Sequence, residues 1–301
     1  MNLAPIVLFT YRRLWHTRQT VEALQENELA RESELFIYSD GWKNDHDKPK
    51  VLEVREYLIT IDGFKEVHII ERERNYGLAD NIIDGVTRIV NRFGRIIVLE
   101  DDIVTSRYFL RFMNEALERY QNTERVFGVT GYAFPINKEK LPKCFFLKLC
   151  SSWSWGTWAR KWKFFKKDTD NLLKIFTKEM IRDFNFDNSM DFWSQVIANK
   201  KGKINSWAIY WYAAVFLNEG LFLYPRDAFA KNIGHDNSGV HCGTTSVYDV
   251  ELVNEYNMVF PSKVEVPPLV RQRHVEYFNS LKVPFLKKVR NKIKQLWTVK
   301  K

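Results

Sequence analysis

Arg95-Ile96-Ile97-Val98-Leu99-Glu100-Asp101-Asp102 is the stretch that decides the fold of this chain. It follows Gly94, and its β-branched run ends in three acids, a pattern typical of an interior strand of a parallel sheet. Open α/β sheets bind ligands just beyond the carboxyl ends of such strands. Three carboxylates there could hold a hard divalent cation. The alternative is a solvated junction between a strand and a helix, with Asp102 or Ser106 capping the helix.

Around this stretch, short apolar runs alternate with longer segments that have the periodicity of amphipathic helices. The pattern predicts strands at 4–10, 34–38, 66–71, 95–100 and 126–130, and helices at 14–29, 50–60, 78–93 and 109–120. Within 78–93 the large apolar residues recur every three to four positions, so they share one helical face. This alternation predicts an α/β fold with a mostly parallel, Rossmann-like sheet flanked by helices.

Composition narrows the class of protein further. The 301 residues suit one large domain, and the net charge is +9. The segment from Lys287 to Lys301 contributes seven basic residues and no acids, which leaves +2 for the rest and argues against a nucleic-acid surface. The three cysteines have no paired spacing, and neither a signal peptide nor a membrane-spanning run is expected. These features favour a cytoplasmic protein.

Polar side chains follow four of the predicted strands, at the point where each strand ends. They are Thr10 and Arg12, then Asp40, then Asn75 to Leu78, and finally Glu100 to Asp102. Because the carboxyl ends of parallel strands meet at one edge of a sheet, we expect these groups to lie together. An aspartate there can accept hydrogen bonds from a ribose or base, and an arginine can face phosphates. For Asp40-Gly41 a plain turn is the alternative.

The chain has no G-x-G-x-x-G sequence after its first strand and no P-loop sequence. A bound phosphate would therefore need its charge met by a metal. The arrangement resembles the GT-A-fold glycosyltransferases, which use nucleotide-sugar donors and a D-x-D or E-D-D metal motif, and in particular the N-acetylglucosaminyltransferase I type and related bacterial family 2-like sugar transferases. The motifs that carry the resemblance are Val7 to Arg12, Phe36 to Asp40, Val98 to Ile103, Trp153 to Trp158 and Gly234 to Gly243.

The resemblance implies a role for each matching residue. Asp102 would be the direct ligand of Mn²⁺ or Mg²⁺, with His241 a further ligand. The nucleotide-sugar donor would be held by Thr10, Arg12, Asp40, Asn75, Gly77, Leu78, Glu100, Asp101 and Ser238. Trp153, Trp155 and Trp158 would line the acceptor-sugar site, although this aromatic block could equally be mostly core. These roles predict a nucleotide-sugar-binding half at 1–135, an acceptor-binding half at 136–270 and a basic tail at 271–301.

The general base is the residue that the resemblance does not supply. Such enzymes carry a carboxylate where this chain has Ala208. Asp191 and Asp236 are the nearest substitutes in sequence, with surface charge and turn formation as their respective alternatives.

The activity implied is inverting transfer of a hexosyl or N-acetylhexosaminyl group to a hydroxyl of a surface glycan or lipid-linked acceptor. The basic tail carries an apolar helical stripe that would suit an anionic membrane surface, so the enzyme could be peripheral on the inner face of the cell membrane. Two other classes stay open: a sugar-phosphate nucleotidyltransferase, and a glycan-binding protein on a degenerate transferase scaffold.

Overall fold

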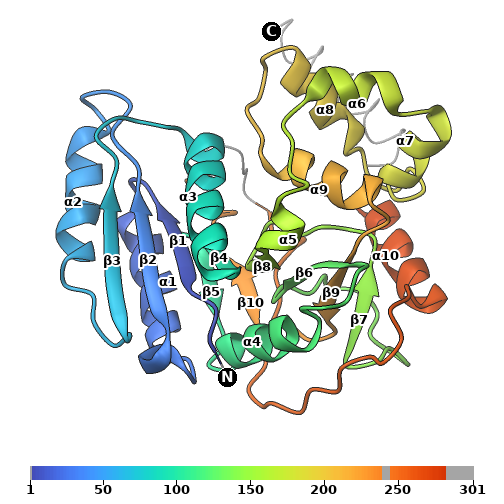
Figure 1. Ribbon diagram of the computed structural model, residues 1–301, viewed down its shortest axis with the longest axis horizontal. Helices are drawn as coiled ribbons and strands as arrows, with labels where there is room; N and C mark the ends of the chain where they lie inside the picture. The colour runs from blue at the N-terminus through green and yellow to red at the C-terminus, as the bar shows by residue number, and fades with distance from the viewer. Residues whose placement is uncertain (1, 239–244, 283–301) are drawn as a thin grey trace, which may run out of the picture.

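The computed structural model of the protein describes residues 2–238 and 245–282. A central sheet of eight strands runs through it in the order β3-β2-β1-β4-β8-β6-β9-β7 (Figure 1). These strands are β1 (Ile6–Thr10), β2 (Glu34–Ser39), β3 (Glu66–Glu71), β4 (Arg95–Glu100), β6 (Val126–Thr130), β7 (Cys144–Leu147), β8 (Trp155–Trp158) and β9 (Leu221–Pro225). A small second sheet pairs β5 (Ile103–Thr105) with β10 (Ala230–Asn232).

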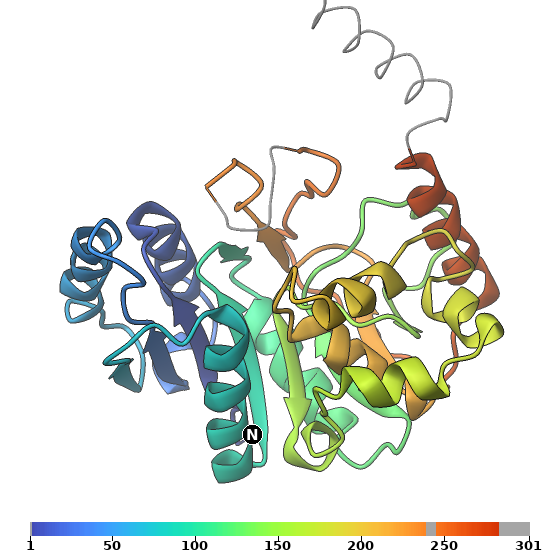
Figure 2. The same ribbon diagram turned by 90° about the horizontal axis from the view of Figure 1, so that it is seen from above.

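The helices pack on both faces of the large sheet. They are α1 (Leu14–Gln25), α2 (Lys48–Leu58), α3 (Leu78–Phe93), α4 (Phe109–Arg119), α5 (Ala159–Trp162), α6 (Thr169–Ile175), α7 (Lys178–Phe184), α8 (Trp193–Lys200), α9 (Ala208–Leu217) and α10 (Pro268–Ser280). Strand residues alternate between two apolar layers, because successive side chains of a strand point to opposite faces. Val7 and Phe9 enter the layer shared with α3 and α9, whereas Ile6 and Leu8 enter the layer shared with α1 and α4. Figure 2 shows α1 and α2 on one side of the sheet and α3 on the other.

The first half of the chain folds as its sequence predicts. β1 to β4 pair in parallel, each helix between them lies within a few residues of its predicted range, and β6 matches residues 126–130. The predicted α/β class, a sheet flanked by helices, is confirmed. Parallel strands need a crossover, and here α1, α2 and α3 supply it.

The second half departs from the expected parallel arrangement. β8 pairs antiparallel with both β4 and β6, and β7 pairs antiparallel with β9. The four residues of β8 are all buried, so they show neither the alternation of a half-exposed strand nor enough length to be recognised. The sequence pattern of this half therefore gave no sign of β7, β8, β9 or β10.

α10 spans the position where the basic tail was expected to begin. Residue 271 lies inside this helix, and Val270, His274 and Phe278 of α10 are buried against the core. The apolar stripe and the lysines of 283–301 lie outside the described residues. In the part of the chain that the structure covers, no helix is both long enough and apolar enough to span a bilayer.

Candidate functional site

A cavity of about 1040 Å³ opens at the carboxyl ends of β1, β2 and β4. Of the residues predicted for donor and metal binding, it is lined by Thr10, Arg12, Asp40, Asn75, Gly77, Leu78, Glu100, Asp101, Asp102 and Ser238. The register explains their convergence, because Thr10 pairs with Ser39 and Phe9 pairs with Glu100, so these strands end together. The volume lies at the upper end of what small-molecule sites usually enclose.

Two of the three acids, Asp101 and Asp102, pair with the same cation, the guanidinium of Arg13. Its Nη2 atom lies 2.8 Å from Oδ2 of Asp102, and Arg13 also pairs with Asp101. Arg13 is 17% exposed in its side chain, and the two aspartates are nearly buried. Asp102 caps no helix: Tyr108 occupies the N-cap position of α4, and the side chain of Asn27 accepts a hydrogen bond from the backbone of Leu110.

One guanidinium does not balance the charge of three carboxylates. The pKa values of two of these acids are raised. Burial raises the pKa of Glu100, and the neighbouring charges of Asp102 and Asp101 raise it further. Burial also raises the pKa of Asp101, although Arg13 opposes the shift. Both shifts mean that added positive charge at this point would stabilise the ionised forms. The donor set is therefore of the kind that a hard divalent cation takes.

Asp40 binds the loop that precedes α3. Its carboxylate accepts hydrogen bonds from the backbone N–H groups of Gly41 (2.9 Å), Tyr76 (2.8 Å) and Gly77 (2.9 Å), and from Nδ2 of Asn75 (3.0 Å). Burial raises the pKa of Asp40, and the backbone hydrogen bonds offset part of that rise. A carboxylate offers about four acceptor positions, so those of Asp40 are occupied by protein donors. In this structure its role is to fix one wall of the cavity.

Arg12 lies on the rim of the cavity, where it pairs with Asp47. The hydroxyl of Tyr11 donates to the same carboxylate at 2.9 Å. The two adjacent arginines after β1 thus have different partners: Arg12 contacts the segment before α2, and Arg13 contacts the acids after β4. Thr10 has a buried Oγ1 atom without a hydrogen-bond partner among the described residues, so it is available to a ligand.

The opposite wall of the cavity comes from the second half of the chain. It is formed by Lys167, Thr169, Asn199, Gly202, Lys203, Ile204, Asn205 and Tyr210. Two lysines and several amide or hydroxyl groups therefore face the acids across the cavity. Periodicity could not assign these residues, because they lie at the ends of α6 and α8, in the segment between α8 and α9, and in the first turn of α9.

The loop after β10 reaches the acids from a third side. A Cβ atom on Gly234 would lie 2.1 Å from Oδ2 of Asp102, so the backbone must come this close with no side chain. Asp236 accepts a hydrogen bond at its Oδ1 from the backbone N–H of Ser238, and its Oδ2 lies 3.0 Å from Nε2 of His16. Hydrogen bonding to Ser238 lowers the pKa of Asp236 to about 2. His241, the further metal ligand of the prediction, lies outside the described residues.

Neither Asp191 nor any of the three predicted tryptophans lines the cavity. Asp191 is exposed at the start of α8, where it accepts a hydrogen bond from the backbone of Ser194. Trp155 is fully buried and stacks on Trp207, with ring centroids 5.2 Å apart. Trp158 is buried on the other face, and its Nε1 donates to a backbone carbonyl of α4.

The prediction that Trp155 and Trp158 line an acceptor site is therefore wrong, because β8 is an interior strand covered on both faces. Trp153, just before β8, is half-buried and packs against Tyr132 and His235, next to the Gly234 loop. Trp153 stays a candidate for contact with an acceptor.

Arg13 is the main site residue that sequence reasoning missed. Its signal was present, since two arginines follow the first strand, but the chain leaves the regular pleat there and periodicity cannot tell which one turns inward. Asp47 was missed for a different reason: its short distance from Arg12 depends on how the segment before α2 folds back over β1.

Comparisons with known proteins add little to this geometry. No family model matches the sequence, and no curated protein does. Among solved structures, the crystal structure of S. aureus TarS aligns with 76% of this chain and 36% of its own, with a TM-score of 0.47 and 9% identity. The crystal structure of S. aureus TarS 1-349 aligns with 75% of this chain and 59% of its own, with a TM-score of 0.43 and 10% identity. This chain thus spans about a third of one neighbour and less than two thirds of the other, and likenesses this distant identify no activity.

Proposed function

We propose that the chain is a glycosyltransferase of GT-A type, which transfers a hexosyl or N-acetylhexosaminyl group from a nucleotide-diphosphate sugar to a hydroxyl of a glycan or lipid-linked acceptor. The observation that carries the proposal is the convergence of Glu100, Asp101 and Asp102 with Thr10 and the Asp40-bound loop at one end of the sheet, around a single large cavity. Enzymes on open α/β sheets bind their ligands at this edge.

The acids fit a divalent cation, Mn²⁺ or Mg²⁺. Burial, together with repulsion between the neighbouring acids, raises the pKa of Glu100 and of Asp101, so a bound cation would favour their ionised forms. Asp102 would hold the ion, with Asp101 beside it. Such an ion would neutralise the diphosphate leaving group of the donor.

The protein's own groups would position the donor and the acceptor. The loop at Asn75 to Leu78 leads into α3, whose first N–H groups carry the partial positive charge of a helix N-terminus and suit an anionic ligand. Thr10 offers a hydroxyl that has no hydrogen-bond partner among the residues that the structure describes. Lys167 and Lys203 on the opposite wall add positive charge to a cavity that would enclose a diphosphate.

Inversion requires one base to take the proton of the acceptor hydroxyl. Of the two predicted candidates, the position of Asp236 supports this role better, because Asp236 is bonded to the cavity residue Ser238, whereas Asp191 is at the surface. Its low pKa keeps Asp236 ionised at neutral pH, as a base must be, and makes it a weak one.

The test is turnover of nucleotide-diphosphate sugars by the purified chain, with and without Mn²⁺, read as release of the nucleoside diphosphate. We expect metal-dependent hydrolysis or transfer with at least one donor, abolished by EDTA and by Asp102→Asn. Asp62→Asn, an exposed carboxylate in the turn before β3, is the matched control and should keep wild-type activity.

Two outcomes would replace the proposal. Release of pyrophosphate from a nucleoside triphosphate and a sugar phosphate would identify a nucleotidyltransferase. Binding of nucleotide sugars without any turnover would identify a binding protein. A ligand at 100 times its dissociation constant adds about 2.7 kcal/mol of stability, so a thermal-shift screen can choose the donors to assay.

The location of the enzyme is a proposal drawn from the sequence. The basic residues of 287–301 would approach an anionic membrane on its cytoplasmic side, where a lipid-linked acceptor could be reached. Binding of the full chain to vesicles with and without anionic lipid, compared with a chain ending at residue 282, tests this: the difference should disappear at high salt.

A further inference from the structure

A second group of metal-ligating side chains lies at the other end of the sheet. Glu34 is the first residue of β2 and Glu66 the first residue of β3, and the two are directly paired in the parallel register. His68 follows Glu66 by two positions, so it projects from the same face of the sheet. Asp40 follows Glu34 by six positions along an extended strand, which places this group about 20 Å from the candidate active site.

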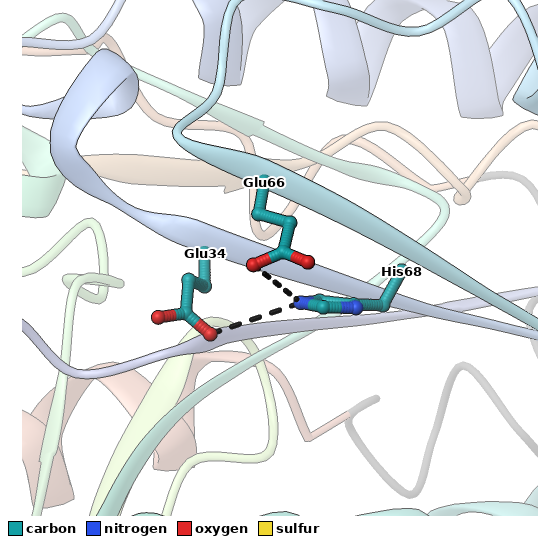
Figure 3. Close-up of side chains that lie close together, drawn as sticks. All are labelled: Glu34, Glu66 and His68. Carbon is teal, nitrogen blue, oxygen red and sulfur yellow. Dashed lines mark ion pairs between the residues drawn. The ribbon is translucent and has the colours of Figure 1, made fainter.

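The three side chains converge on one point, as Figure 3 shows. Nε2 of His68 lies 3.7 Å from Oε2 of Glu34 and 3.5 Å from Oε2 of Glu66. Both distances are too long for hydrogen bonds. They are close to the spacing of about 3.4 Å between two ligands bound tetrahedrally to one zinc ion, given metal–ligand bonds of about 2.1 Å.

The imidazole is held in this orientation by packing. Its ring stacks on Phe36 with centroids 4.2 Å apart and an interplanar angle of 15°. Nε2 is buried from solvent and has no hydrogen-bond partner among the described residues. A buried polar atom without a partner is unusual in a folded protein, and here it points between two carboxylates.

The negative charges of Glu34 and Glu66 would also favour a bound cation. Two carboxylates directly opposite each other on neighbouring strands repel, and this destabilises the pair. Lys65 contacts Glu34 at 3.2 Å, but its side chain is 59% exposed and pairs with no second acid in the part of the chain that the structure describes. A divalent ion would neutralise the remaining charge and give Nε2 a partner.

We propose that Glu34, Glu66 and His68 form a binding site for a divalent transition-metal ion of the Zn²⁺ class, completed by water. One imidazole and two carboxylates are a ligand set that Zn²⁺ takes, whereas Mg²⁺ and Ca²⁺ prefer oxygen alone. The ion would connect β3, the edge strand of the large sheet, to β2. Its role would be structural, because the site lies at the opposite end of the strands from the cavity.

The experiment is equilibrium dialysis of the metal-free full chain against Zn²⁺, with the bound equivalents measured. Because Asp102 and its neighbours could also take the ion, the wild type is compared with Asp102→Asn, with Glu66→Gln and with the Asp102→Asn/Glu66→Gln double variant. We expect Glu66→Gln to lose one equivalent of Zn²⁺ that Asp102→Asn retains. The double variant should lose this equivalent and any that Asp102 binds. Glu73→Gln, an exposed carboxylate just beyond β3, is the matched control and should bind like the wild type.

His68→Gln removes the nitrogen ligand and should also lose that equivalent. Because this change also removes the stacking on Phe36, Glu66→Gln, whose side chain is 60% exposed, keeps the test valid if His68→Gln does not fold. Zn²⁺ should raise the melting temperature of Asp102→Asn and leave that of the double variant unchanged. Equal Zn²⁺ binding by Glu66→Gln and the wild type would overturn the proposal. So would a wild type whose Zn²⁺ binding depends entirely on Asp102.

Discussion

Nη2 of Arg13 lies 2.8 Å from Oδ2 of Asp102, so a guanidinium occupies part of the space next to the acid predicted to hold the metal. Arg13 leads into α1 from the end of β1, and Asp102 follows β4, the neighbouring strand in the sheet. The pair therefore joins two strand ends across the mouth of the cavity. A metal ion and Arg13 would then share the negative charge of the three acids.

Arg13→Gln should destabilise the protein by about 3 kcal/mol, because it leaves the buried carboxylates of Asp101 and Asp102 without their cation. Mn²⁺ should restore part of that loss by supplying positive charge at the same place. Urea denaturation with and without Mn²⁺ measures both effects. Arg12→Gln is the matched control: Arg12 is 33% exposed in its side chain and contacts Asp47 instead, so its loss should be smaller and insensitive to Mn²⁺. If Mn²⁺ does not reduce the loss of stability in Arg13→Gln, this account is contradicted.

Asp40→Ala should lower the free energy of unfolding by roughly 1–3 kcal/mol, since the N–H groups of Gly41, Tyr76 and Gly77 lose their acceptor. Donor binding should weaken in parallel, because the loop at 75–78 forms a wall of the cavity. Asp40→Asn keeps one acceptor oxygen, so its stability should lie between those of the wild type and Asp40→Ala. Denaturation and donor titration check the prediction. Unchanged stability with abolished donor binding would instead mean that Asp40 contacts the donor directly.

Gly77→Ala should cost about 2–3 kcal/mol of stability although no atom lies within 4 Å of the added methyl group. The reason is the backbone: Gly77 has φ 74° and ψ 154°, a region almost closed to residues with a side chain. Gly94→Ala is the matched control, because Gly94 has φ 80° and ψ −22°, and this left-handed region costs other residues about 1 kcal/mol. Equal losses in the two variants, measured by thermal denaturation, would contradict the argument.

His274 should make the protein sensitive to acid. It lies in α10 among Phe134, Phe145 and Phe278, its Nδ1 donates to the carbonyl of Val270 at 2.7 Å, and burial lowers its pKa to about 4. In the unfolded chain its pKa is about 6.5, so between these values the unfolded state binds more protons. This contribution to stability is complete above pH 6.5 and is lost as the pH falls toward 4, about 3 kcal/mol in all.

His274→Phe removes this titration and keeps an aromatic ring in the apolar cluster. The free energy of unfolding of this variant should therefore depend less on pH between 6.5 and 4 than that of the wild type, whereas acids elsewhere contribute equally to both proteins. Urea denaturation at several pH values gives the two curves. Parallel curves would show that His274 is not buried in its neutral form.

The sequence by itself determined the first half of the sheet and the place of the candidate site. Parallel strands of five or six residues, separated by amphipathic helices, leave little choice of topology, and the polar residues that follow such strands must meet at one edge. Glu100, Asp101, Asp102, Thr10, Asp40 and the loop at 75–78 were found in this way, because their positions depend only on strand ends.

The tertiary structure alone decided which groups contact one another. Arg13 rather than Arg12 turns toward the acids, and Trp155 and Trp158 are core. The second wall of the cavity comes from helix ends and connecting segments of the second half, whose place opposite the acids no periodic signal indicates. The pairing of Glu34 with Glu66 and His68 likewise needs the register of β2 and β3. Periodicity in a sequence reports which face of an element is buried. Contacts between irregular segments, and between side chains on neighbouring strands, depend on how separate elements pack, and residue spacing along the chain does not encode that.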